Sequence, residues 1–306
     1  MPPDNDRATR MSLFLLAGIA TLDIINTVDH YPAEDEELRA SARRISAGGN
    51  ALNAARVLTG LGHRAELLAL LADDDGGGRI RAELDAERVG HRYAPLAAGV
   101  TPTSYVALSA ANGSRTIIHY RDLPELRYAH FRAVPIERFD WLHFEGRNVA
   151  ETEAMLRHAR KRLLDQPISL EIEKPRPDIE RLMPYADVLI FSRAYALARG
   201  HTQAAELLAA MRPHAPRASL VCAWGEAGAW ALATNRQLAR EAVHAPAVKA
   251  GQTVDTLGAG DAFNAGLIAA LATGATLDEA LARAVALAGH KVTAHGFAHL
   301  GKARPS

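Results

Sequence analysis

Short apolar runs alternate along most of this sequence with longer stretches in which alanine and leucine recur at helical spacing. This alternation is typical of strand, helix, strand and helix units built around a mostly parallel sheet. The runs expected to be strands are LFLLAGIA, AELLALL, WLHFEG, ISLEIE, DVLIFS and SLVCAW. The stretches expected to be helices are GNALNAARVLTGLG, GGRIRAELDAERVG, AETEAMLRHARKRLL, TQAAELLAAMR and AGDAFNAGLIAALATG. We therefore predict an α/β fold with a doubly wound, mostly parallel sheet.

Two regions interrupt this rhythm, and we expect them to form a small accessory sheet. Residues 28–47 are polar with alternating short apolar residues, and residues 95–122 contain two β-rich arms around Asn112-Gly113. An Asn-Gly pair between such arms is a strong hairpin signal. The accessory sheet would cover a site or pair with another subunit, although a plain surface hairpin fits equally well. Residues 12–300, these two segments included, would form one domain, with disordered tails at 1–11 and 301–306.

Composition narrows the class of partner and the compartment. The 306 residues carry 35 Lys plus Arg and 35 Asp plus Glu, with no extended basic block, so a nucleic-acid partner is not expected. The only cysteine is Cys222, which excludes an internal disulfide and suits a reducing, cytoplasmic location. The apolar run after the N-terminus is too short to span a membrane. Tyr120, Trp141 and Trp224 are interpreted as core aromatics.

The stretch DTLGAGDAFNAGL, starting at Asp255, combines a glycine-rich turn with a helix start. Gly258-Ala259-Gly260 lets the backbone approach a ligand, and the free N–H groups of a helix N-terminus attract anions. Asp261 at that position would partly repel a phosphate. Either it caps the helix, or it takes a proton from an alcohol while the adjacent amides hold the phosphate that the alcohol attacks. Neither a Walker A sequence nor GxGxxG fits this stretch.

A second polar group is expected nearer the start of the chain. In SAGGNALNAARVL, Asn50 and Asn53 follow Gly48-Gly49 and lie three residues apart, so both amides face one side of a helix and could bind a polyol. The alternative is that Asn50 caps the helix and Asn53 is solvated. Asp23 comes just past the first predicted strand, where ligands gather in parallel sheets, and its carboxylate could accept two sugar hydroxyls.

Two of these strings resemble the signature sequences of the ribokinase-like (PfkB) sugar kinase family. GGNALN lies near the start and DTLGAGDAFNAG near the end, in the usual order and at the usual separation. The resemblance runs from Leu13 to about Leu300. Within the family, NGSRTIIHYRDLP, WLHFEGRN, EIEKPR and VCAW resemble the ketose kinases that phosphorylate fructose. The resemblance implies a ribokinase-like fold whose accessory sheet is a small antiparallel β lid.

The activity implied by the resemblance is transfer of the γ-phosphoryl group of ATP to a primary hydroxyl of a ketose, with Mg²⁺ as a cofactor and K⁺ as a second candidate ion. A homodimer joined through the lid is also implied. Other acceptors stay open, namely an aldose, a sugar acid, a phosphosugar or a nucleoside, as does a sensor that binds sugar or nucleotide without transfer. The neutral charge and the single candidate Arg115 argue against a phosphosugar.

Residue by residue, the resemblance assigns roles to three groups of positions. Asp261 matches the catalytic base, and Gly258, Ala259 and Gly260 match the anion hole. The positions that match sugar contacts are Asp23, Asp35, Gly49, Asn50 and Asn53. Arg115 matches an arginine that reaches sugar or phosphate from the lid, and Gly225 and Gly228 match the turn that lies against the nucleotide.

The metal site is the least defined part of the resemblance. Many family members carry an Asn-x-x-Glu sequence linked to Mg²⁺, and the corresponding place here reads Ser192-Arg193-Ala194-Tyr195. Glu171 and Glu173 lie two apart on a predicted strand and so share one face, where they could hold Mg²⁺ through water. A solvated pair at a strand edge is the alternative.

Overall fold

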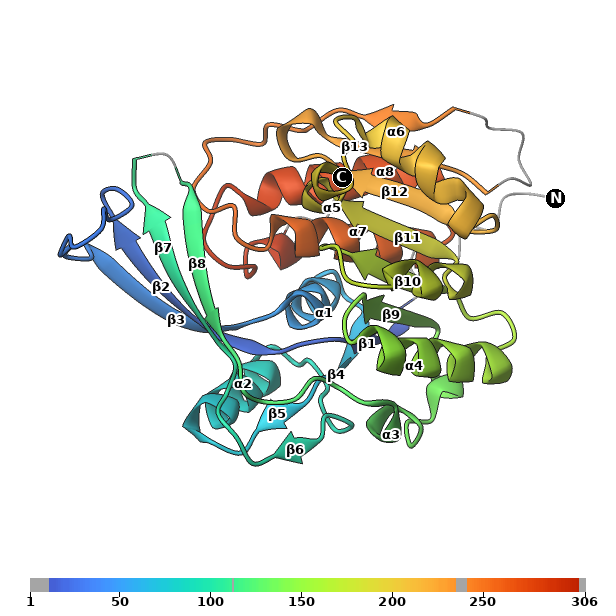
Figure 1. The fold of residues 1–306 in the computed structure, drawn as a ribbon, viewed down its shortest axis with the longest axis horizontal. Coiled ribbons are helices and arrows are strands. Elements are labelled where there is room, and N and C mark those ends of the chain that lie inside the picture. Colours follow the sequence, from blue (N-terminus) through green and yellow to red (C-terminus); the bar gives the residue numbers. More distant parts are fainter. Residues whose placement is uncertain (1–10, 112, 235–240, 303–306) are drawn as a thin grey trace.

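The computed structural model describes residues 11–111, 113–234 and 241–302. Its central sheet has the strand order β14-β13-β12-β11-β10-β9-β1-β4 (Figure 1). The strands are β1 (Leu13–Ala17), β4 (Arg64–Leu68), β9 (Trp141–Glu145), β10 (Ile168–Ile172), β11 (Val188–Ser192), β12 (Ser219–Ala223), β13 (Ala229–Leu232) and β14 (Val243–Ala245). All pairings from β4 to β12 are parallel, and β13 and β14 add an antiparallel edge. The six predicted strand runs are confirmed, whereas β13 and β14 were not predicted.

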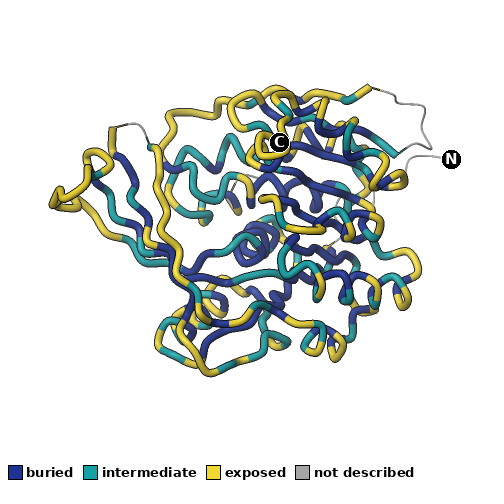
Figure 2. Tube along the Cα trace, in the orientation of Figure 1, coloured by how far each residue is buried: buried dark blue, intermediate teal, exposed yellow. Residues whose placement is uncertain are grey.

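Helices cover both faces of this sheet and bury it, as a doubly wound fold requires (Figure 2). One apolar cluster joins the sheet to α1 (Asn50–Gly60), α2 (Asp75–Ala86), α7 (Ala259–Ala272) and α8 (Leu277–Lys291). The other joins it to α3 (Tyr128–Phe131), α4 (Val149–Arg162), α5 (Arg193–Ala198) and α6 (Ala204–Met211). The short 3₁₀ turns are η2 (Ile136–Arg138), η3 (Ile179–Tyr185), η4 (Arg212–His214), η5 (Gly225–Ala227) and η6 (Leu300–Lys302). The five predicted helices are present, and α8, which was not predicted, begins with a Thr276/Glu279 capping box.

A second sheet, which we call the lid, projects from one side of the core (Figure 1). It consists of β2 (Thr21–Val28), β3 (Ala42–Gly48), β7 (Thr103–Ser109) and β8 (Arg115–Tyr120), in the order β3-β2-β7-β8. The β7–β8 hairpin confirms the predicted arms, while Asn112 of its turn lies outside the described residues. The two hairpin pairings are antiparallel, but the central β2–β7 pairing is parallel.

The boundaries of the lid differ from those predicted. Its first segment begins at Thr21 rather than residue 28, and residues 29–41 form the connection between β2 and β3. Leu96–Ala97 (β6) pairs with Leu71–Ala72 (β5) in a separate two-stranded sheet and does not belong to the lid. Of the predicted tails at 1–11 and 301–306, residues 1–10 and 303–306 lie outside the described residues, whereas residues 301 and 302 belong to η6.

Two smaller expectations also need correction. Tyr120, expected in the core, is 51% exposed on the lid, whereas Trp141 is buried as expected. Asp23 lies within β2 of the lid, paired with Ser46 and Ser104, rather than just past a strand of the parallel sheet. The reason is that the chain leaves β1 at Ala17 and enters a second sheet almost at once.

Candidate active site

The turn at the start of α7 presents open backbone. Gly258 has a φ of 79°, and a Cβ there would lie 2.3 Å from Phe297 Cζ, so both conformation and packing require glycine. A Cβ on Gly260 would meet nothing within 4 Å. The Ala259 amide donates to the carbonyl oxygen of Thr256 at 3.3 Å, and the first-turn amides of Gly260 and Asp261 have no acceptor within their own helix. The helix dipole adds partial positive charge at the same place, so this turn can hold an anion such as a transferred phosphoryl group.

The Asp261 side chain turns into the protein and does not cap the helix. The N-cap residue is Gly258, and the Asp261 carboxylate is instead buried, with Asn53 Nδ2 donating to its Oδ2 at 2.8 Å. Burial raises the pKa of Asp261 to about 7, the Asn53 hydrogen bond opposes this, and repulsion from Glu145, Glu173 and Asp23 adds to it. The capping interpretation is therefore wrong, and the carboxyl group has the proton affinity suited to a base at neutral pH.

The two predicted amides on α1 do lie on one side and face acidic partners. The N-cap of α1 is Gly49, with no side-chain cap bond, so the alternative in which Asn50 caps the helix is wrong. Asn50 Nδ2 lies 3.2 Å from Glu171 Oε2 and 3.4 Å from Glu173 Oε2. Asn53 is buried rather than solvated, and its Oδ1 has no hydrogen-bond partner among the described residues. A buried carbonyl oxygen beside Asp261 that lacks a donor suits an incoming hydroxyl.

Asp23 is held at the root of the lid beside the glycines that precede α1. Thr21 Oγ1 donates to its Oδ1 at 2.9 Å, and a Cβ on Gly48 would come within 2.0 Å of its Oδ2. Burial raises the pKa of Asp23, although hydrogen bonds from Thr21 and Ser104 lower it. Gly49, with a φ of 104°, leaves no room for a side chain because a Cβ would lie 2.5 Å from the Ile19 carbonyl oxygen.

Glu171 and Glu173 share one face of the strand end, as their spacing predicts, and both contact Asn50. Asn264 Nδ2 also donates to Glu171 Oε1 at 2.9 Å. Burial, with repulsion from Asp261, Glu145 and Glu173, raises the pKa of Glu171 well above its usual range. No group of three or more His, Cys, Asp or Glu side chains within the described ranges could hold a metal ion by itself.

Glu145 and Asn264 belong to this acidic cluster and were not predicted from the sequence. Glu145 Oε1 accepts hydrogen bonds from the amides of Ile19 at 2.9 Å and Ala51 at 2.8 Å. Burial raises its pKa, and the charge of Arg147 lowers it. Asn264 follows Asp261 by three residues on α7, and this spacing is the signal that could have identified it.

Both edge strands of the lid contact the loop that precedes the Gly258–Gly260 turn. Arg115 of β8 donates from Nη1 to Thr256 Oγ1 at 2.6 Å, and Arg44 Nη2 of β3 lies 3.1 Å from Asp255 Oδ2. Asp255 also accepts from the amide of Leu257 at 2.9 Å, and Nζ of the fully buried Lys291 lies 3.3 Å from its Oδ2. The lid therefore rests on the segment that leads into Gly258, through residues that the sequence pattern did not indicate, Arg115 excepted.

Three predicted positions lie apart from this cluster. Asp35 is exposed in the loop between β2 and β3, at the end of the lid opposite its junction with α1. Gly225 and Gly228 have φ values of 61° and 91°, and a Cβ on Gly228 would lie 2.1 Å from the Ala245 carbonyl oxygen. Packing alone thus explains Gly228, and a nucleotide role for the two glycines stays a prediction.

A buried carboxylate of raised pKa, at a helix N-terminus that can hold an anion, defines a site for transfer of an anionic group to a hydroxyl. The family model for pfkB family carbohydrate kinases matches residues 11–302. The chain belongs to this family, and it is a phosphotransferase whose acceptor is an alcohol group.

Two related enzymes and one solved structure resemble the chain over most of its length. Ketohexokinase of Mus musculus is 38% identical over 292 residues, covering 92% of this chain and 97% of that protein. Fructosamine kinase FrlD of Bacillus subtilis (strain 168) is 27% identical over 282 residues, covering 89% of each. The structure of Arabidopsis thaliana ribokinase complexed with ribose and ATP has a TM-score of 0.75 at 20% identity, covering 95% of this chain and 96% of that chain. The predicted ribokinase-like fold is confirmed.

Proposed function

We propose that this protein transfers the γ-phosphoryl group of ATP to a primary hydroxyl of a ketose, with the C1 hydroxyl of fructose as the first candidate. The observation that carries the proposal is the Asp261 carboxylate, buried in the first turn of α7 and hydrogen-bonded to Asn53 at 2.8 Å. Its pKa of about 7 lets it accept a proton near neutral pH.

In the proposed reaction the chain supplies a base, an orienting amide and an anion hole. The acceptor hydroxyl donates to Asp261, which takes its proton as the oxygen attacks the γ-phosphorus. Asn53 Oδ1, which has no partner among the described residues, can accept from a neighbouring hydroxyl of the sugar. The new O–P bond forms as the bond from phosphorus to the ADP oxygen breaks, and Asp261 later returns its proton to water. The amides of the Gly258–Gly260 turn stabilise the charge on the transferred oxygens, because they are already oriented toward it.

The cofactor proposal is MgATP. Mg²⁺ supplies charge neutralisation on the phosphates, and it usually keeps several waters and takes one or two carboxylates from the protein. Glu173, whose side chain is 39% exposed, fits that role through water better than Glu171, whose oxygens accept from Asn50 and Asn264. A requirement for K⁺ stays a prediction, as does contact of Gly225 and Gly228 with the nucleotide.

A ketose acceptor is favoured by the similarity to a mammalian ketohexokinase, while the fructosamine kinase leaves room for substituted ketoses. Asp23, Asn50 and Asn53 would contact the sugar. Asn53 donates to Asp261, the charge of Asp23 raises the pKa of Asp261, and Asn50 lies one helical turn before Asn53. Asp35 of the same chain is not part of this arrangement. A sugar or nucleotide sensor would not need a buried base.

A homodimer joined through the lid is supported by an apolar lid face. Tyr105, Ile118 and Tyr120 are 48%, 67% and 51% exposed. Tyr105 pairs with Ile118, and Tyr120 follows Ile118 by two residues, so all three side chains lie on the same face. Contiguous exposed apolar groups of this kind mark interaction surfaces. No helix in the described part of the chain is long and apolar enough to cross a membrane, and a cytoplasmic location stays a prediction from the single cysteine.

The test is ADP release from MgATP with fructose, tagatose, ribose, 2-keto-3-deoxygluconate, fructose 1-phosphate and adenosine, using Asp261→Asn as the catalytic control. Turnover with fructose that disappears in the variant supports the proposal. Turnover with another acceptor only would move the substrate. Ligand-induced thermal stabilisation without any ADP would refute the kinase and support a sensor.

A further inference from the structure

We propose that His119, at the root of the lid where this sheet joins the core, is a specificity-determining residue that accepts a hydrogen bond from a hydroxyl at the far end of the acceptor sugar. Ser104 and Asp23 hold its ring in position for this role. The hydroxyl is that of C4 or C6 when C1 receives the phosphoryl group. The inference deepens the proposed kinase function and rests on it for the identity of the sugar.

Three side chains form one row across the root of the lid. Asp23 of β2 is paired with Ser104 of β7, and Ser104 is paired with His119 of β8, so all three project from the same face of the sheet. Ser104 Oγ lies 3.3 Å from His119 Nδ1, and Ser104 also hydrogen-bonds to Asp23. Asp23 and Ser104 are buried, whereas His119 is exposed. The row therefore ends in a ring that a ligand can reach.

This face of the lid is the one that is turned toward the proposed active site. Arg115 lies four residues before His119 on β8, hence on the same face, and it contacts the loop that precedes α7. Apolar residues of the same face pack with Leu257 of that loop. At the root, the charge of Asp23 adds to burial in raising the pKa of Asp261. The row therefore belongs to the wall of the space in front of the proposed base.

The hydrogen bonds within the row determine which ring nitrogen of His119 is free. Burial raises the pKa of Asp23, and the hydrogen bond from Ser104 lowers it, so the single hydroxyl proton of Ser104 is donated to the carboxylate. The Ser104 oxygen then accepts from His119, which places the ring proton on Nδ1. Nε2 is left as an acceptor without a hydrogen-bond partner in the described part of the chain. An acceptor of fixed direction at the open end of the row suits a sugar hydroxyl.

Neighbouring cations keep the His119 ring neutral. Partial burial lowers the pKa of His119, and the charges of Arg121, Arg147 and Lys174 lower it further. A neutral imidazole keeps the lone pair on Nε2, whereas the protonated ring would donate from both nitrogens. The ring is therefore an acceptor at the pH at which Asp261, with a pKa of about 7, can act as a base.

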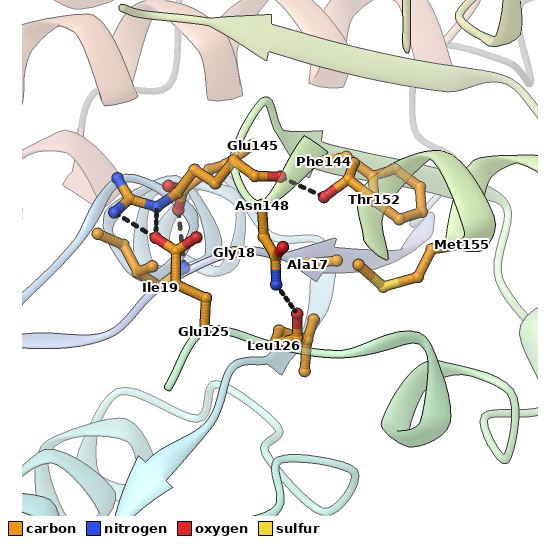
Figure 3. A pocket seen from close by; sticks show the side chains of 11 residues that line it. Ala17, Gly18, Ile19, Glu125, Leu126, Phe144, Glu145, Asn148, Thr152 and Met155 are labelled. Atoms are coloured by element: carbon orange, nitrogen blue, oxygen red, sulfur yellow. Dashed lines mark hydrogen bonds and ion pairs between the residues drawn. The ribbon is translucent and has the colours of Figure 1, made fainter. Parts of the chain in front are cut away.

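Two of these cations line adjoining hollows at the carboxyl ends of the parallel strands. One hollow, of about 280 Å³, contains Arg147 paired with Glu125 at 2.6 Å (Figure 3). The other, of about 200 Å³, is lined by Arg147 and Lys174 together with Asn50. His119 belongs to neither lining, and it lies on the lid side, close enough for both charges to lower its pKa. The ring thus approaches the acceptor from the side opposite Asn50.

The place of His119 in the row sets which part of the sugar it can contact. Neighbouring strands lie about 4.8 Å apart, so His119, two strands from Asp23, starts about 10 Å from it. A hydroxyl that donates to Asp261 is therefore not the one that reaches His119. Hydroxyls at the other end of a hexose are nearer, and an analogue that lacks the matching hydroxyl leaves Nε2 without a donor and binds less well.

The experiment measures kcat/KM for fructose, 4-deoxyfructose and 6-deoxyfructose. The proteins are the wild type, His119→Leu and the matched control His214→Leu, which replaces an exposed histidine on η4. A neutral hydrogen bond changes binding about 3- to 10-fold, so the preference of the wild type for fructose over one of the deoxy sugars should fall by about this factor in His119→Leu. The control should keep the wild-type preference.

Ser104 is expected to act through His119 as a positioning residue. Ser104→Ala should lower the same preference by a smaller factor, and its addition to His119→Leu should not lower the preference further. The ring ¹⁵N chemical shifts of His119 in the wild type should place the proton on Nδ1. A proton on Nε2 overturns the proposal, as does a further fall in the double variant.

The outcomes separate this proposal from the kinase proposal. ADP formation with fructose, together with equal losses on all three sugars in His119→Leu, overturns the role of His119 and leaves the kinase proposal standing. If no acceptor yields ADP, the kinase proposal fails, and the rise in Tm caused by fructose decides the role of His119. A rise that is smaller in His119→Leu than in the control supports the contact, and any other pattern overturns it. His119→Ala repeats the test if His119→Leu does not fold.

Discussion

The substitution Asp261→Asn is expected to abolish most of the turnover and, at the same time, to stabilise the protein at neutral and alkaline pH. A carboxylate base contributes about 10²- to 10⁴-fold to a proton-transfer reaction, so kcat should fall within that range. An amide keeps the size of the side chain and can still hydrogen-bond to Asn53, so the fold and ATP binding should persist.

The stability change follows from the pKa of Asp261. Burial raises this pKa from its ordinary value of 3.8 to about 7, with repulsion from neighbouring carboxylates adding to it. A raised folded-state pKa means that the folded protein binds the proton more tightly than the unfolded chain. The associated stability is fully present below pH 3.8 and is lost as the pH rises through about 7. At about 1.4 kcal/mol for each tenfold change in proton affinity, the full loss is about 4 kcal/mol.

We therefore expect Asp261→Asn to unfold at higher denaturant concentration than the wild type at pH 8, by about 1–4 kcal/mol in free energy of unfolding. The difference should shrink at pH 5, where the wild-type carboxyl group is protonated. The matched control is Asp165→Asn, at an exposed position in the connection between α4 and β10. A variant that keeps near-normal kcat refutes the role of Asp261 as the base. A variant less stable than the wild type at pH 8 refutes the electrostatic argument.

Three further predictions concern the loop and turn that precede α7. Gly258→Ala should destabilise the protein by more than about 1 kcal/mol and lower kcat, because Gly258 has a φ of 79° and a Cβ there would lie 2.3 Å from Phe297. The measurement is urea unfolding. Gly62→Ala is the control for the effect of φ alone, because Gly62 has a φ of 92° and a Cβ there would meet nothing within 4 Å. In the same assay, Lys291→Met should lower the free energy of unfolding by about 3–5 kcal/mol, because it removes the buried cation that pairs with the Asp255 carboxylate. A decrease smaller than that of Gly62→Ala would contradict this. Burial raises the pKa of Asp255, but Lys291, the Leu257 amide and Arg44 together lower this pKa below its ordinary value of 3.8. The wild type should therefore lose stability as the pH falls below 3.8, and the Lys291→Met variant should lose less stability over the same range.

Much of the site could be predicted because its residues lie close to glycine-rich turns at helix starts. Gly258, Ala259, Gly260 and Asp261 are contiguous, and Asn50 and Asn53 share a helix face by spacing alone. The choice between a capping and a buried role for Asp261 could not be made from the sequence. That choice depends on Asn53, which is 208 residues away and lies beside it only in the folded chain.

The residues that were missed are those whose partners come from distant segments. Glu145 becomes significant because the amides of Ile19 and Ala51 converge on one of its oxygens. Arg44 contacts Asp255 across 211 positions of sequence, and neither residue carries a local signal of that contact. Asp35 is the opposite case, because only a match to a family position places it with the sugar contacts; in the single chain it lies exposed in the loop between β2 and β3, and its role stays a prediction.

The sequence by itself determined the α/β class, the parallel core strands, the hairpin of the lid and the helix start that can hold an anion. These features depend on periodicity, turn residues and glycine, all of which act over a few neighbouring residues. Only the tertiary structure decided which charges meet. It gathered Asp23, Glu145, Glu171 and Asp261 into one buried acidic cluster. The physical reason is that burial and long-range pairing set the energy of a charge, and neither is encoded in local spacing.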